Sequence, residues 1–471
     1  MTERGDTEPA RPAQGRWRGR DHTRAGLLGS LAVLSTPMLA SSGLTLAFQL
    51  ADLSFLAQLG DAPMAAVIIA NQTLRQFVMM LLMGVAFGSQ ALIARAVGEG
   101  DTERAEHVAG QLVLIGAVFS SLVACIGLTI PDLLFRVAGS DPSFAPHGVP
   151  YVRLIFSLTF GMAGFQLFNA ILSGAGDTTT PFYVMMVQTL VAISAEWILI
   201  FGNLGAPQLG VRGVALGTAT GQVLAMAIGF SVLFRGRARI HLRRRHLKPD
   251  LVTIRQILKL SWPPSVQMGV QALVVVIYVR LAGGFGESVQ AAYAIGLRIG
   301  MIGPMLCFPL ASACATLVAQ ALGAGNVPRA WRALRIGLLV HCGIMWLIAW
   351  GLFSFRGELM NLLSNDPAVI EVGTEYLLYL AGAFVCWAFY FVFFRALQGA
   401  GDMLVPMLIS VGVSLVISVP LAHLLSDAMG RQGLWLAFLI AVLATAAGTT
   451  WRVASGRWIR RLEPGAAGPW A

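Results

Sequence analysis

Charged residues are scarce in this chain. Only 12% of its 471 residues are Asp, Glu, Lys or Arg, whereas 56% are apolar, and the mean hydropathy is +0.72. A soluble domain carries about 25% charged residues. A soluble fold could not bury this much apolar surface, but a bilayer solvates it directly. The composition therefore excludes a soluble domain and predicts an integral membrane protein whose main partner is the lipid bilayer.

Several functional signals are also missing. The five cysteines lie in apolar segments without metal-ligand spacing, so we interpret them as small buried hydrophobes. No HExxH motif or Gly-rich nucleotide loop occurs, and the two GAGD turns lack the lysine of a phosphate loop. We therefore expect no enzyme activity and no cofactor other than a coupling ion. Residues 1–24 are polar and Arg-rich without the apolar core of a signal peptide, which predicts a disordered cytoplasmic tail.

Long apolar runs predict an all-α integral membrane protein with twelve transmembrane helices. Each run has the roughly 20 residues needed to cross a bilayer. The predicted spans are 25–52, 63–93, 107–131, 149–172, 181–203, 211–234, 252–282, 289–320, 331–354, 372–396, 405–426 and 433–453.

Lys and Arg gather on one side of these spans. They concentrate in the N-terminal tail, in the loop after the sixth span, in the loop after the eighth and at the C-terminus. This asymmetry places both termini in the cytoplasm. It also accounts for the net charge of +10. The basic run at 235–248 could alternatively bind RNA, but membrane anchoring is favoured and no nucleic-acid partner is expected.

The chain contains an internal repeat. LIARAVGEGDTERA at 92–105 resembles LVAQALGAGNVPRA at 317–330, and SGAGDTTTP at 173–181 resembles QGAGDMLVP at 398–406, both 225 residues apart. Tyr151 and Tyr376, and the Asp-Pro pairs at 141 and 366, keep the same offset. The repeat predicts two homologous six-helix bundles in the same orientation, an arrangement suited to alternating access. The predicted domains are a tail at 1–24, bundles at 25–234 and 251–453, a basic cytoplasmic linker at 235–250 and a cytoplasmic tail at 454–471.

Two acidic residues interrupt the apolar spans. Asp52 lies in the first span and Glu196 in the middle of the fifth. A carboxylate at the bilayer centre costs at least about 2.5–3.5 kcal/mol, so such residues are usually functional. Burial favours the neutral form, so the pair could exchange protons for a cationic substrate or a metal ion. The alternative is a neutral carboxylic acid that serves helix packing.

These repeated segments resemble the multidrug and toxic compound extrusion (MATE) family. The resemblance is carried by ADLSFLAQLGDAPMAAV at 51–67, FGNLGAPQLGVRGVALGTA at 201–219 and the two GAGD turns. It implies a V-shaped pair of bundles and proton- or sodium-driven antiport that exports organic, often cationic or amphipathic, compounds across the cytoplasmic (inner) membrane. Asp52 and Glu196 match positions of the family's cation site, as does the hydroxyl of Thr218. Ala192 falls where many members carry an Asn ligand, so we favour H⁺ over Na⁺ at this site.

Other polar residues are candidates for a substrate cavity. In the second half, Tyr278 replaces the acid at the position of Asp52, and Gln271 stands where some family members have Glu. Arg75 and Arg298 occupy similar places in the two repeats and could receive an anionic group. Together with Arg280 and Arg395, they keep open an alternative function, a lipid-linked saccharide flippase with a wide, basic central cavity. For Arg280 and Arg395, near span ends, we favour snorkelling toward the headgroups. We expect the protein to be a monomer.

Overall fold

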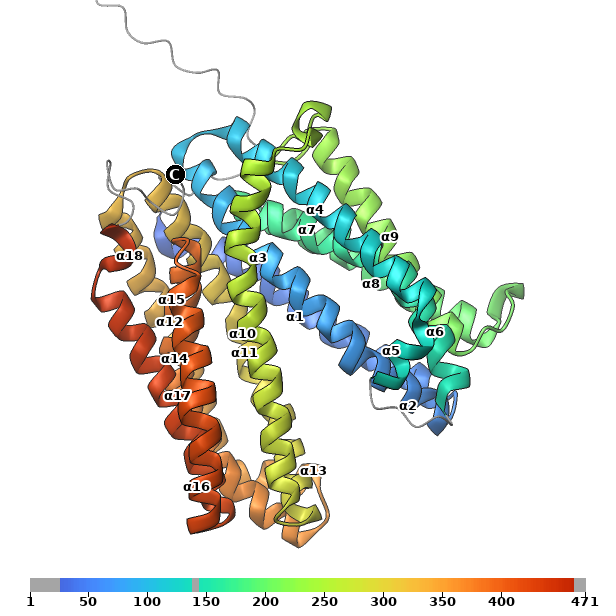
Figure 1. The fold of residues 1–471 in the computed structure, drawn as a ribbon, viewed down its shortest axis with the longest axis vertical. Coiled ribbons are helices and arrows are strands. Elements are labelled where there is room, and N and C mark those ends of the chain that lie inside the picture. Colours follow the sequence, from blue (N-terminus) through green and yellow to red (C-terminus); the bar gives the residue numbers. More distant parts are fainter. Residues whose placement is uncertain (1–25, 138–143, 461–471) are drawn as a thin grey trace, which may run out of the picture.

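The computed structural model describes residues 26–137 and 144–460. Within them, eleven helices are long and apolar enough to cross a membrane, and a bent pair of helices makes a twelfth span. The helices form the two lobes of a V, in which the first lobe continues into the second through the linker (Figure 1). The twelve-helix prediction is confirmed.

The first lobe contains six spans. They are α1 (Leu27–Ala57); α2 (Asp61–Ile69), a π-helical turn (Ala70–Arg75) and α3 (Gln76–Glu99) in one rod; α4 (Thr102–Thr129); α6 (Ala145–Ser157) with α7 (Thr159–Ala175); α8 (Thr179–Phe201); and α9 (Val211–Phe234). A short helix, α5 (Pro131–Val137), precedes α6.

The second lobe repeats this order. Its spans are α10 (Leu251–Gly283), α11 (Glu287–Gly323), α12 (Val327–Ser354), α14 (Pro367–Gly399), a rod made of α15 (Leu404–Gly412), a π-helical turn (Val413–Ser418) and α16 (Val419–Met429), and α17 (Arg431–Ala454). The short helices α13 (Arg356–Leu363) and α18 (Arg457–Arg460) were not expected from the apolar runs.

One predicted span is not straight. The fourth span was expected as one run at 149–172, but α6 and α7 meet at Leu158 with a bend of 47°. Leu158 leaves the α-helical conformation, with φ −99° and ψ 14°. Its repeat counterpart α14 is a single helix of 33 residues. The bend therefore belongs to the first lobe alone.

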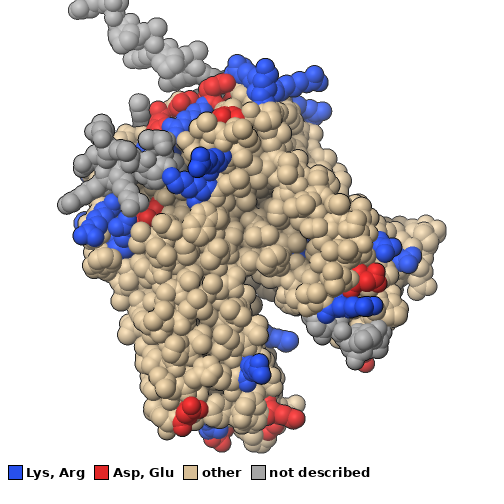
Figure 2. All heavy atoms as spheres, in the orientation of Figure 1, with Lys and Arg blue, Asp and Glu red and all other residues tan. Residues whose placement is uncertain are grey.

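The two lobes meet at one end and separate at the other. Figure 2 shows a cleft between them that widens toward the end carrying α2, α5, α13 and α16. The linker lies at the closed end, where the main chain of His246 and Lys248 accepts hydrogen bonds from the Gln111 amide of α4. We call this closed end the linker end. The Asp-Pro landmark at 141, the tail at 1–24 and most of the tail at 454–471 lie outside the described residues.

Candidate functional site

The first lobe encloses a group of polar side chains contributed by five elements. Asp52 lies on α1, Arg75 on the π-helical turn, Tyr151 on α6, Glu196 on α8 and Thr218 on α9. The charge on Asp52 acts on Glu196 and on Tyr151, and the charge on Arg75 acts on Asp52, Tyr151 and Glu196. The structure thus brings the two acids predicted from sequence into one electrostatic environment, with a cation beside them.

Glu196 is fully buried, with 0% of its surface exposed. The Thr218 hydroxyl on α9 donates a hydrogen bond of 2.6 Å to its Oε1. Its Oε2 is buried without a hydrogen-bond partner in the described chain, and so is Oδ1 of the half-buried Asp52. A carboxylate oxygen that is buried without a donor is costly when charged. The free oxygens therefore suit a proton or a transient cation.

Glycines on α9 let this helix lie directly against α8. A Cβ added at Gly217 would stand 2.5 Å from Cγ of Glu196, and one at Gly221 would stand 2.7 Å from Cβ of Ala192. Gly213 continues the same stripe one turn earlier, close to the main chain of Leu199. Small residues four apart commonly allow close packing of membrane helices. This packing places Thr218 within reach of Glu196.

Two members of the site were missed from sequence. The Tyr151 hydroxyl donates to Oδ1 of Asn71 at 3.0 Å, which ties α6 to the π-helical turn. Tyr151 was noted only as a landmark of the repeat, and this recurrence was a usable signal. Asn71 carried no sequence signal, because a π-helical turn has no distinct residue pattern, although such turns are frequent at functional sites.

The second lobe carries an aromatic residue, Tyr278, at the position that Asp52 occupies in the first lobe. Tyr278 is 2% exposed and its hydroxyl lies 2.9 Å from Oγ of Ser418. Its ring stacks on Tyr293, which packs in turn on Tyr376 and Trp435. Tyr278 is therefore part of the core of its lobe, and its predicted contact with substrate would require another conformation.

The remaining candidates for a substrate cavity are separated. Arg75 is half-buried beside the acidic pair, whereas Gln271 and Arg298 are exposed on the second lobe. The Gln271 amide lies 3.5 Å from Oγ of Ser410. The snorkelling expected for Arg395 is wrong: this side chain is 2% exposed and lies between the lobes, because α14 turns it toward α3 rather than toward the membrane surface. Arg280 is exposed.

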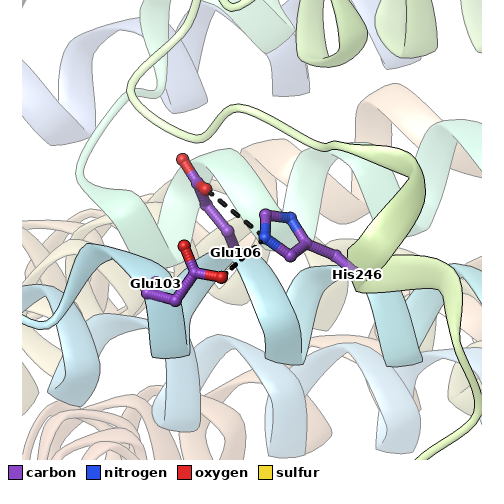
Figure 3. A group of neighbouring side chains, drawn as sticks. All are labelled: Glu103, Glu106 and His246. Carbon is purple, nitrogen blue, oxygen red and sulfur yellow. Dashed lines mark hydrogen bonds and ion pairs between the residues drawn. The ribbon is translucent and has the colours of Figure 1, made fainter.

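A separate group at the linker end has the composition of a metal site. Glu103 and Glu106 on α4 converge with His246 of the linker, with ligand atoms within 4.8 Å of one another (Figure 3). Nδ1 of His246 accepts the main-chain N–H of Arg243 at 3.3 Å. Its Nε2 lies 3.0 Å from Oε1 of Glu103 and 3.0 Å from Nε of Arg245. A histidine that binds a metal usually donates a hydrogen bond from its other nitrogen, whereas Nδ1 of His246 accepts one. We therefore interpret this group as an attachment of the linker to α4.

Comparison with known proteins follows the same two-lobe division. A family model described as MatE matches residues 37–198 and again residues 263–424. The chain is 25% identical over 435 residues to a "Probable multidrug resistance protein NorM" of Thermotoga maritima, covering 92% of this chain and 93% of that protein. It is 24% identical over 428 residues to an "FAD transporter" of Shewanella oneidensis, covering 89% and 94%. A structure titled "Crystal structure of MATE in the bent conformation" superposes with a TM-score of 0.86 at 22% identity, covering 95% and 98%.

Proposed function

Because this chain belongs to the MatE family of multidrug efflux transporters, we propose that it is a cation-coupled antiporter that exports organic compounds by alternating access. The observation that carries the proposal is the pairing of Asp52 and Glu196 inside one lobe, each with a buried carboxylate oxygen that lacks a hydrogen-bond partner among the described residues. Proteins of this family are transporters, and no enzyme activity is proposed.

The acidic pair supplies a means of exchange. When both carboxyls are neutral, burial costs little, whereas two negative charges in one buried site repel each other. A proton that leaves the pair creates a negative charge that attracts a cationic or amphipathic substrate, and a returning proton displaces it. Arg75, which acts on both acids, limits how much negative charge the site develops. The proposed substrates are therefore organic compounds that are often cationic or amphipathic.

The geometry favours H⁺ over Na⁺ as the coupling ion. A bare cation needs several oxygen ligands, and Asp52, Glu196 and Thr218 provide few. Ala192 lies one turn before Glu196 and is 3% exposed. It packs against the main chain of α9 at Gly221, so no further ligand approaches from that direction. A proton needs only one oxygen, and the two free carboxylate oxygens supply it.

The distribution of charge supports an orientation. The linker carries Arg243, Arg244, Arg245 and Lys248 at the closed end of the V, where Figure 2 shows blue side chains. The positive-inside rule assigns this end to the cytoplasm. The cleft then opens to the outside, and both termini lie in the cytoplasm of a cell whose cytoplasmic membrane holds the protein. Because one chain contains both lobes and the acidic pair, a monomer suffices for this mechanism.

Transport by purified protein in liposomes tests the proposal. With a pH gradient imposed and sodium absent, we expect uphill movement of a lipophilic cationic dye that Asp52→Asn abolishes. Asp427→Asn is the matched control, because it neutralises an exposed acid of α16 in the other lobe and should leave transport unchanged. Dye movement that survives Asp52→Asn would remove this residue from the mechanism. Movement that requires sodium would refute proton coupling.

The comparisons do not favour a lipid-linked saccharide flippase. The arginines that kept this alternative open do not converge, since Arg75 lies in the first lobe and Arg298 is exposed on the second.

A further inference from the structure

Arg395 is a charged residue buried where the two lobes meet. It lies on α14 of the second lobe, is 2% exposed, and faces α3 of the first lobe. Beside it is a cavity of about 10 Å³ lined by residues of both lobes, among them Gln90, Ala94 and Thr316. That volume is about enough for one water molecule. The guanidinium is thus enclosed at an interface that must separate if the linker end opens.

Neutral groups surround this guanidinium. It donates to Oε1 of Gln398 at 2.6 Å and to Oγ of Ser312 at 2.9 Å, both in its own lobe. Across the interface it donates to Oε1 of Gln90 at 3.1 Å. The rings of Phe87 and Phe308 lie 4.2 and 5.2 Å from its central carbon. Its Nε is buried without a hydrogen-bond partner, and these contacts include no carboxylate from the described residues.

The interface around Arg395 is closely packed at the main-chain level. A Cβ added at Gly98 of α3 would stand 2.1 Å from the carbonyl oxygen of Gln320, and one at Gly323 of α11 would stand 2.2 Å from that of Arg95. These two glycines occupy equivalent positions of the repeat, 225 residues apart. The Gln90 amide also donates to Oγ1 of Thr316 at 3.2 Å across the same surface. Apart from the Arg395–Gln90 hydrogen bond, these contacts between the lobes are made by small residues and by neutral amides and hydroxyls.

We propose that Arg395 limits the stability of the closed linker end, so that the lobes can separate there during transport. This inference rests on the alternating access of the proposed function. A buried charge without a counter-charge loses its hydration on closing, and neutral hydrogen bonds and ring faces return only part of that free energy. When the lobes separate, water restores the hydration. Replacing a buried charge with an apolar residue of similar volume is often stabilising.

The proposal predicts opposite effects for the two partners across the interface. Arg395→Met keeps much of the side-chain volume but removes the charge, so the closed state should become more populated. Gln90→Leu removes the acceptor that crosses the interface and leaves the charge in place, so the closed state should become less populated. Removing a hydrogen bond to a charged group changes an equilibrium by about tenfold or more. The double variant should return toward the native equilibrium, because the apolar side chain at position 90 then faces no charge.

Labelling of a buried cysteine measures the opening directly. In a background without the five native cysteines, Ala94→Cys places a thiol at a position that is 0% exposed in the closed state. A membrane-impermeant maleimide then reacts at a rate proportional to the open fraction. We expect Arg395→Met to slow labelling about tenfold and Gln90→Leu to accelerate it about tenfold. Arg332→Met, which removes an exposed arginine of α12, is the matched control and should not change the rate.

Two results would overturn the proposal. Faster labelling in Arg395→Met would show that this residue holds the lobes together, and equal rates in all variants would show that it serves packing alone. Arg395→Lys keeps the charge with fewer donors, so it should label at least as fast as the native residue. The assay needs neither substrate nor an ion gradient. A failure of proton-coupled transport would therefore leave this result intact, and the two inferences can fail separately.

Discussion

Replacing Thr218 with valine removes one hydrogen bond and little else. Valine has nearly the shape of threonine, and Thr218 is 4% exposed, so the packing of α9 on α8 should persist. The hydroxyl that donates to Oε1 of Glu196 at 2.6 Å is lost. The second oxygen of this carboxylate already lacks a partner among the described residues. In Thr218→Val, Glu196 therefore keeps no hydrogen bond from the surrounding helices.

The size of the effect follows from the charge state of the carboxyl. A hydrogen bond to a charged group contributes about 1.5–3 kcal/mol, and one between neutral groups about 0.5–1.5 kcal/mol. Losing the bond therefore disfavours the negatively charged form relative to the neutral form by about 1 kcal/mol, which is about fivefold in population. The charged form is the one that attracts a cationic substrate. We expect transport at low substrate concentration to fall about fivefold.

The assay compares Thr218→Val with Thr218→Ser in proteoliposomes under a fixed pH gradient. Serine retains the hydroxyl and should keep transport close to that of the native protein. Circular dichroism and thermal unfolding establish that both variants are folded. If Thr218→Val transports like the native protein at low substrate concentration, the hydrogen bond to Glu196 does not influence coupling and the reasoning is refuted.

Two further predictions concern stability. Gly217→Ala would force a methyl group against Glu196, which should cost about 1–3 kcal/mol in a thermal unfolding assay; Gly43→Ala, a helical glycine with no atom within 4 Å of an added Cβ, is the control and should cost nothing. Side-chain hydrogen bonds, the larger contribution from Thr253 and the next from His107, lower the pKa of Asp250 to about 2. The charged carboxylate of Asp250 therefore stabilises the fold at pH values above the ordinary Asp pKa of about 3.9. This stabilisation is lost as the pH falls through 2, because the carboxylate becomes protonated. Pepsin cleavage of the linker, normalised to an unfolded substrate, should rise between about pH 4 and 2, and this rise should be absent in Asp250→Ala.

Much of the fold was available from sequence because the bilayer imposes a length on every apolar run. The predicted sixth span coincides with α9 at 211–234, and the others differ from the observed helices mainly by a few residues at their ends. The repeat predicted two equivalent lobes, which the family model matches separately. The π-helical turn at Ala70–Arg75 and the bend at Leu158 were not predictable, because neither is marked by a residue pattern that distinguishes it from a regular helix.

The candidate site, like the fold, was only partly predictable from the sequence. Asp52 and Glu196 were identified from sequence because a carboxyl within an apolar span is costly and therefore rarely incidental. Their role in coupling remains a prediction. Which groups surround them was decided only by tertiary packing, since the glycines of α9 bring Thr218 to Glu196 and the π-helical turn brings Asn71 to Tyr151. Arg395 shows most clearly what the sequence could not predict. Its sequence position near a helix end suggested the membrane surface, but the direction in which α14 faces its neighbours placed its charge between the lobes.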